Sequence, residues 1–149
     1  MNELVYRNLS EDAKRQICAW KYGGEYDLYN LPSYEEMQVR QIGFMNPQRE
    51  KNYYGFWDES ILVGFVNILE EKEEIFIGIG VNPDLCNKHY GQRMLSITYE
   101  ISKKLYPNKP LYLEVRTWNI RAIKCYQKAG FRIDGQAYEL TTGIGTGTF

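Results

Sequence analysis

Two periods of hydrophobic residues follow one another along the chain of 149 residues. In the first third, apolar residues recur with the spacing of a helix, as at Ala13 and Ile17, and a serine precedes each such stretch. Glu36, three residues after Ser33, completes a capping box. The pattern predicts a strand over residues 4–8, a helix between Ser10 and Gly23, a tyrosine-rich loop over 25–31 and a helix between Ser33 and Gly43.

The middle of the chain changes to β-rich runs separated by short polar breaks, which predicts an antiparallel meander. The runs cover residues 52–57, 61–69 and 74–81. A helical period returns from 91 to about 106, and a strand over 111–115, a helix over 119–129 and closing strand material at 131–133 and 136–140 follow. This order predicts one α/β (α+β) domain over residues 1–149, with a mixed sheet of about six to seven strands and four flanking helices.

Composition and charge exclude several classes of protein. Lys and Arg (18) nearly balance Asp and Glu (19), so a broad nucleic-acid surface is not expected. No apolar run approaches the length that spans a bilayer, and the first residues lack a secretory signal pattern. The cysteines Cys18, Cys86 and Cys125 are too dispersed for a zinc site or a disulfide framework. We therefore expect a cytoplasmic protein without a metal, a nucleic-acid partner or a membrane partner.

The segment from Val81 to Arg93 passes from a strand through a polar loop directly into an amphipathic helix. Backbone N–H groups in the first turn of a helix have no intrahelical acceptor, and the helix dipole adds positive charge there. Lys88 adds a full positive charge to the loop. The segment therefore predicts a site for an anion such as a pyrophosphate.

This segment resembles the acyl-CoA pyrophosphate loop of the GNAT superfamily of N-acetyltransferases. The family pattern has Val-x-Pro, then Arg or Gln, and then two small residues; its positions fall here on Val81, Pro83, Cys86, His89 and Gly91. A second stretch is similar to the family signature Asn-x-x-Ala followed by Tyr-x-x-x-Gly-Phe, with its positions on Asn119, Ala122, Tyr126, Gly130 and Phe131. With the loops and the order of elements counted, the resemblance covers about residues 52–137 in detail and the helical N-terminal part loosely.

The resemblance implies a GNAT fold and the use of acetyl-CoA. It implies cofactor binding by Ile79, Val81, Cys86, Asn87, Lys88, His89, Tyr90, Gly91, Gln92 and Asn119. In the family arrangement, backbone N–H groups at a bulge in the preceding strand polarise the acetyl carbonyl, and Gly78 and Gly80 suit such a bulge.

The implied reaction is transfer of an acetyl group to a primary amine of a small molecule by direct attack. Tyr126 is the candidate acid for the leaving thiolate, with packing as its alternative role. Glu74 and the adjacent Glu73 are the candidate bases, although their acidic surroundings also fit a solvated turn, and His89 is a further alternative. Cys86 and Cys125 have no local histidine partner and are interpreted as packing residues rather than nucleophiles.

The tyrosine-rich segment before residue 35 is the candidate binding surface for the amine substrate. Tyr26 and Tyr29, interleaved with Glu25 and Asp27, suit a cationic amine, whereas the other aromatic residues nearby, Trp20 and Tyr22, are interpreted as packing residues. Two other functions stay open. One is acetylation of a protein N-terminus or lysine, and the other is a non-catalytic CoA-binding sensor. The oligomeric state also stays open, with a homodimer among the options.

Overall fold

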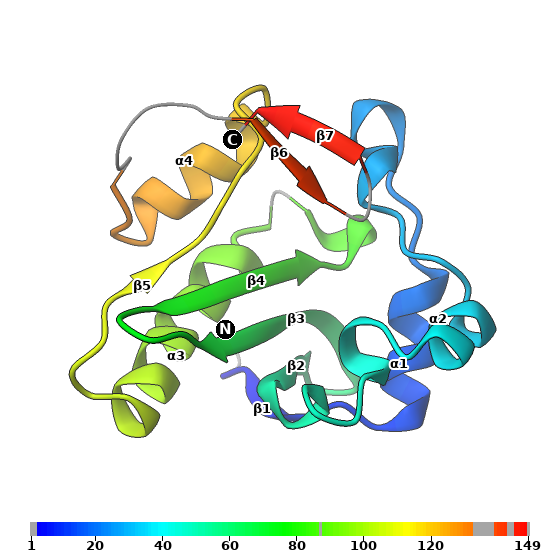
Figure 1. Cartoon of the computed structure of the whole chain (residues 1–149), viewed down its shortest axis with the longest axis horizontal. Helices are drawn as coiled ribbons and strands as arrows, with labels where there is room; N and C mark the ends of the chain where they lie inside the picture. Colours follow the sequence, from blue (N-terminus) through cyan, green and yellow to red (C-terminus); the bar gives the residue numbers. More distant parts are fainter. Residues whose placement is uncertain (1–2, 87, 133–138, 143–144, 149) are drawn as a thin grey trace.

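The computed structural model describes residues 3–86, 88–132, 139–142 and 145–148, with a mixed β-sheet at its centre (Figure 1). Its strand order is β1-β2-β3-β4-β5, and all neighbours are antiparallel except the parallel pair of β4 and β5. The strands are β1 (Val5–Asn8), β2 (Tyr53–Asp58), β3 (Ile61–Glu70), β4 (Ile75–Val81) and β5 (Leu111–Tyr112). Two more strands, β6 (Glu139–Thr142) and β7 (Gly145–Thr148), form a separate antiparallel pair.

The predicted fold class is confirmed, with a smaller sheet than expected. In the described part of the chain the main sheet has five strands, because β6 and β7 pair only with each other. The strand predicted over 111–115 shortens to two residues, since pairing with β4 ends at Phe76 and Tyr112. Phe131 and Arg132 lie outside any strand. Residues 133–138 of the predicted closing strand lie outside the described residues.

Serine caps begin the first two α-helices where the sequence predicts them. The Ser10 hydroxyl oxygen accepts a hydrogen bond from the Ala13 N–H, and that of Ser33 accepts one from the Glu36 N–H, each at 3.1 Å. The two helices are α1 (Glu11–Ala19) and α2 (Tyr34–Arg40), both shorter than predicted. The loop predicted between them contains a 3-10 helix, η1 (Gly24–Tyr29).

The remaining helices flank the second half of the sheet. A short 3-10 helix, η4 (Pro83–Leu85), follows β4 and leads into α3 (Tyr90–Leu105). The last helix is α4 (Ile120–Lys128), which Gly130 terminates with a φ of 102° in the left-handed region. Two further 3-10 turns, η2 (Gly43–Met45) and η3 (Glu50–Asn52), connect α2 to β2.

Two hydrophobic clusters hold these helices to the sheet. The first packs α3 against the inner strands through Met94, Leu95 and Ile77. The second packs α1 and α2 through residues such as Ile17 and Met37. The helical segment before the sheet is thereby fixed beside the end of β4, where the candidate site lies (Figure 1).

A buried cation joins α1 to η3. The Lys14 ammonium lies 2.9 Å from a Glu50 carboxylate oxygen and 3.3 Å from a Glu11 carboxylate oxygen, and its side chain is 3% exposed. Burial alone would lower the pKa of Lys14, but the contacts with both glutamates raise it overall. Lys14 is therefore a paired structural cation.

Candidate active site

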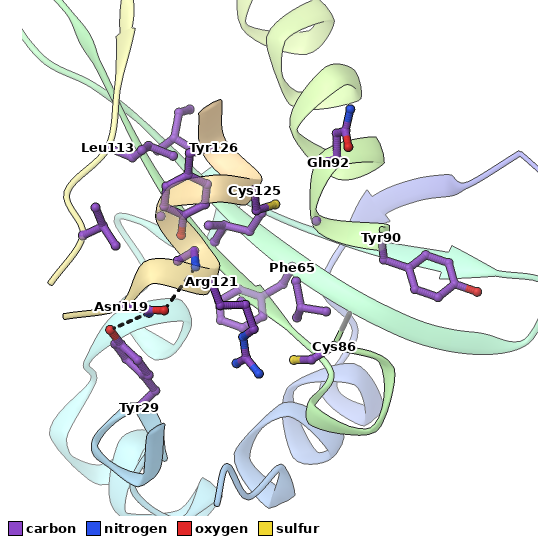
Figure 2. A pocket seen from close by; sticks show the side chains of 18 of the residues that line it. Tyr29, Phe65, Cys86, Tyr90, Gln92, Leu113, Asn119, Arg121, Cys125 and Tyr126 are labelled. Carbon is purple, nitrogen blue, oxygen red and sulfur yellow. Dashed lines mark hydrogen bonds between the residues drawn. The ribbon is translucent and has the colours of Figure 1, made fainter. Parts of the chain in front are cut away.

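A cavity of about 600 Å³ lies where β4 and the chain after β5 separate (Figure 2). One wall is the second half of β4 with the loop that follows it, and the opposite wall is α4 with residues 113–116. The third wall comes from the segment between α1 and α2. Both family-like motifs therefore face the same cavity.

The exposed edge of β4 presents backbone donors to this cavity. The Ile75 N–H donates to the Pro110 carbonyl at 2.8 Å, whereas the Asn82 N–H points to β3 and donates to the Val63 carbonyl at 2.8 Å. Successive strand residues direct their N–H groups to opposite edges. The N–H groups of Ile79 and Val81 therefore face the same edge as that of Ile75, beyond the point where β5 stops pairing.

The prediction of a β-bulge at Gly78 and Gly80 is wrong. The β3–β4 register is regular from Gly64 opposite Val81 to Glu70 opposite Ile75. Gly80 instead leaves room for the ring of Phe65, which a Cβ atom at that position would overlap. The strand therefore offers its donors from regular backbone, and the glycine serves packing.

The loop after β4 ends in a left-handed residue. His89, at a glycine position of the family pattern, is the N-cap of α3 with a φ of 65° and makes no side-chain capping hydrogen bond. The first helical bond runs from the Arg93 N–H to the His89 carbonyl, so the preceding N–H groups of α3 have no helical acceptor. Lys88 is exposed and does not line the cavity. Asn87 lies outside the described residues.

The predicted cofactor residues at the start of α3 line the cavity, but their side chains have structural partners. The Tyr90 hydroxyl donates to an Asp58 carboxylate oxygen at 2.6 Å, and the Gln92 amide donates to the Lys128 carbonyl at 3.4 Å. At Gly91, an added Cβ would lie 3.0 Å from the Cys125 sulfur. These residues therefore present mainly their backbone N–H groups, rather than their side chains, to the cavity.

Tyr126 lies on α4 with its ring against the cavity (Figure 2). Burial raises the pKa of its phenol well above the ordinary value, and Cys125 and Tyr29 raise it further. The hydroxyl has no hydrogen-bond partner among the described residues, which leaves it available to a bound molecule. Burial likewise raises the pKa of the Cys86 thiol, although Arg121 partly opposes this, so Cys86 is a poor thiolate nucleophile.

Asn119 lines the cavity and is 6% exposed. Its side-chain oxygen accepts the Ala122 N–H at 3.1 Å and so caps α4, while its amide donates to the Tyr29 hydroxyl at 3.0 Å (Figure 2). The Tyr29 ring also lies 6.2 Å from the Trp118 ring. Asn119 therefore ties η1 to the start of α4.

Tyr26, predicted to hold a cationic amine, does not line the cavity. Its ring lies 5.6 Å from the Trp118 ring, and the Arg121 guanidinium carbon lies 4.0 Å from its centroid. The cation on this ring thus comes from the protein itself. We call Tyr26, Tyr29, Trp118, Asn119 and Arg121 the aromatic clasp.

The two predicted packing residues Trp20 and Tyr22 do line the cavity. The Tyr22 hydroxyl donates to the Val81 carbonyl at 2.6 Å, and burial raises the pKa of this phenol. The bond pins the segment after α1 to the end of β4. Tyr22 is therefore part of the site's framework.

Sequence reasoning missed the charged side chains of the cavity. Among the described residues that line it, one carboxylate is present, that of Glu114, together with four cations: Arg116, Arg121, Lys124 and Lys128. The spacing of Arg121, Lys124 and Lys128 on one helix face was a signal available from sequence. Glu74, the predicted base, is exposed at the start of β4 and does not line this cavity.

The described ranges hold neither a metal-binding cluster nor a membrane-spanning helix. No cluster of three or more histidine, cysteine, aspartate or glutamate side chains there is arranged to hold a metal. No helix in the same ranges combines the length and apolar character needed to cross a bilayer.

A curated relative matches part of the chain. It is a probable spermine N(1)-acetyltransferase of Bacillus subtilis subsp. natto (strain BEST195), 31% identical over 100 residues. The match covers 59% of this chain and 66% of that protein.

Solved structures share the fold at low sequence identity. AAC(6')-Ib in complex with ribostamycin and coenzyme A has a TM-score of 0.73 and 17% identity, with 98% of this chain and 90% of that chain covered. A chimera of spermidine N-acetyltransferase SpeG from Vibrio cholerae and hSSAT has a TM-score of 0.76 and 18% identity, with 99% and 92% covered.

A sequence model of a known family covers most of the chain. Residues 10–131 match the acetyltransferase (GNAT) family, a range that includes the pyrophosphate-loop motif and the Asn119 to Phe131 motif. The solved structures above agree with this match in fold. The chain therefore belongs to the acetyltransferase (GNAT) family.

Proposed function

We propose that the protein transfers the acetyl group of acetyl-CoA to a primary amine of a small molecule by direct attack. The observation that carries this proposal is the open edge of β4 facing Tyr126 across one cavity. Donors for a thioester oxygen and a hydroxyl for its sulfur thus face the same cavity. The family supports acetyl transfer, and the curated relative, by name, acts on an amine.

The residues fit acetyl-CoA as a substrate along the length of the cavity. Its pyrophosphate suits the open N–H groups at the start of α3 with Lys88 close by. Lys124 and Lys128 of α4 also line the cavity, and their positive charges attract the phosphates. The N–H groups of Ile79 and Val81 are placed for the amide and acetyl oxygens, because β5 leaves them unpaired.

The amine must lose a proton before it attacks, because an alkyl ammonium has a pKa of about 10.4. In our proposal Glu114 is the base that receives this proton through water, since it supplies the carboxylate of the described cavity lining. Glu74 is exposed outside the cavity, so Glu114 takes the role that the sequence suggested for Glu74.

The neutral nitrogen then attacks the thioester carbonyl, and the N–H groups of Ile79 and Val81 stabilise the oxyanion. Collapse of the tetrahedral intermediate forms the amide bond and breaks the carbon–sulfur bond. Tyr126 donates its proton as charge develops on sulfur, so that free thiol leaves. Its raised pKa keeps the phenol protonated and ready to donate at neutral pH. The attacking nitrogen then loses its second proton, which returns through water to the Tyr126 oxygen, so that a neutral amide forms and the phenol is restored.

A small acceptor is favoured over a protein by the contacts that tie η1 to the start of α4 beside the cavity. The aromatic clasp draws η1 onto the start of α4 through the Tyr29–Asn119 hydrogen bond and the Tyr26–Trp118 contact. A peptide channel would need an open path on both sides. Acetylation of protein amines stays the alternative, and peptides are therefore included in the test below.

The test is thiol release from acetyl-CoA with polyamines, aminoglycosides, amino acids, monoamines and peptides as acceptors, with acetyl-CoA binding followed by calorimetry. We expect turnover with at least one small amine and none faster with peptides. Tight binding without turnover on any acceptor would instead indicate a CoA-binding sensor.

Two conservative variants identify the base. Glu114→Gln should lower kcat by about a hundredfold or more, because proton removal by a positioned base contributes that much. Glu74→Gln is measured in parallel as the base predicted from sequence. A larger loss in Glu74→Gln than in Glu114→Gln would refute the assignment of Glu114.

A further inference from the structure

The charges that line the cavity are unevenly distributed. Within residues 3–86 and 88–132, whose side chains the structure describes, the lining holds a single carboxylate, Glu114, and four cations, of which Lys124 and Lys128 are assigned above to the phosphates of acetyl-CoA. An acceptor with several ammonium groups needs several anionic partners, because an unpaired buried charge costs several kcal/mol. The described lining supplies one, and the proposed mechanism already uses it.

The wall formed by the segment between α1 and α2 is apolar and aromatic. Its cavity-lining residues are Trp20, Tyr22, Tyr29 and Leu31, and Ile17 of α1 adjoins them. The Trp20 ring packs 6.3 Å from the Phe65 ring, which also lines the cavity. Glu25 and Asp27, the carboxylates of this segment, are exposed and do not line it. The body of an acceptor therefore meets apolar surface here.

Arg121 places its positively charged guanidinium beside this wall. Its guanidinium rests on the Tyr26 ring, which in turn packs on Trp118, so the charged group is positioned by this ring. Its charge lowers the pKa values of both Tyr22 and Cys86, in opposition to their burial. It therefore stands between the aromatic wall and the loop after β4 (Figure 2).

We infer that the acceptor is a primary monoamine with an apolar body, and that a second ammonium group is selected against. This inference rests on the proposed function and specifies its substrate class. Trp20, Tyr22, Leu31 and Phe65 contact the body of the acceptor, Glu114 takes the proton of its amine, and Arg121 repels any further cation. Polyamines are then poor substrates, in contrast to what the name of the curated relative says of that protein.

A matched pair of acceptors tests the charge rule directly. Hexylamine and hexamethylenediamine share the same chain and the same reactive amine, and they differ in the second ammonium. At saturating acetyl-CoA we expect kcat/KM for hexylamine to exceed that for the diamine by about tenfold or more, from repulsion and an unpaired charge. Phenethylamine should exceed both, and spermine should be the poorest acceptor.

Two variants tie this preference to Arg121. Arg121→Gln should reduce the ratio of hexylamine to diamine kcat/KM by about threefold or more, because one nearby charge is removed. Lys128→Gln is the matched control, since it removes a cation about 10 Å further along the same helix. Its ratio should stay at the wild-type value even if acetyl-CoA binds more weakly.

The outcomes separate this inference from the function on which it rests. Equal or faster turnover of the diamine or of spermine would overturn the monoamine rule and leave acetyl transfer to small amines standing. The same holds if Lys128→Gln shifts the ratio as much as Arg121→Gln. Absence of thiol release with every amine, despite acetyl-CoA binding, would refute the proposed function itself.

Discussion

Replacement of Tyr126 by phenylalanine removes one oxygen from the centre of the proposed mechanism. The ring can keep its packing on α4, and no described residue loses a hydrogen-bond partner. We therefore expect the free energy of unfolding to change by less than about 1 kcal/mol. The reaction, in contrast, loses the group that protonates the leaving sulfur.

The expected loss follows from the usual contribution of a positioned acid. General acid catalysis supplies about 10²–10⁴ in rate, so kcat of Tyr126→Phe should fall by that factor. This corresponds to an increase of about 3–5 kcal/mol in the activation barrier. Because no other described side chain is assigned to the sulfur, KM for acetyl-CoA should change much less than kcat.

Thiol release at saturating acetyl-CoA measures this effect, with thermal unfolding of the same sample as the check on folding. Tyr99→Phe is the matched control, because Tyr99 lies on the exposed side of α3, away from this cavity. Burial raises the pKa of Tyr126, so ionisation of the phenol should not reduce wild-type kcat below a pH of about 10. A Tyr126→Phe rate within threefold of wild type, the margin we set for no effect, would refute an acid role for this phenol.

Three more predictions test the framework of the site. Tyr22→Phe removes the hydrogen bond to the Val81 carbonyl and should cost about 1 kcal/mol of stability in chemical denaturation, with a higher KM for the amine; an unchanged KM would contradict a link between the two walls. His89→Gly should raise the free energy of unfolding by up to about 1 kcal/mol, because glycine adopts the left-handed conformation without strain, and a lower melting temperature would count against this reading. Lys14 has a raised pKa when folded, so its ion pairs stabilise the fold fully below the unfolded pKa of about 10.4, and this contribution is lost as pH rises through the folded pKa. Lys14→Met should abolish that alkaline loss in pH-dependent denaturation, and a slope equal to wild type would assign the loss to other groups.

Elements whose signals lie within a few residues of one another could be predicted from the amino-acid sequence. Ser10 and Ser33 begin α1 and α2 because a serine hydroxyl caps the N–H group three residues later. The meander of β2, β3 and β4 follows from β-rich runs with short polar breaks. The two motifs identified the family because their chemistry requires particular residues at short fixed spacings, and the family match confirms this prediction.

The side chains that share the cavity could not be predicted in this way, because they come from distant parts of the chain. Glu114 and Glu74 are both carboxylates beside strands, yet one lines the cavity because β5 ends at Tyr112 and the chain diverges from β4 there. The Arg121 guanidinium lies over the Tyr26 ring, although Glu25 and Asp27 beside Tyr26 in the sequence suggested that this ring binds a substrate amine. The Tyr29–Asn119 hydrogen bond joins residues 90 positions apart. Contacts of this kind have no local pattern, because packing of helices on the sheet, rather than spacing along the chain, brings their partners together.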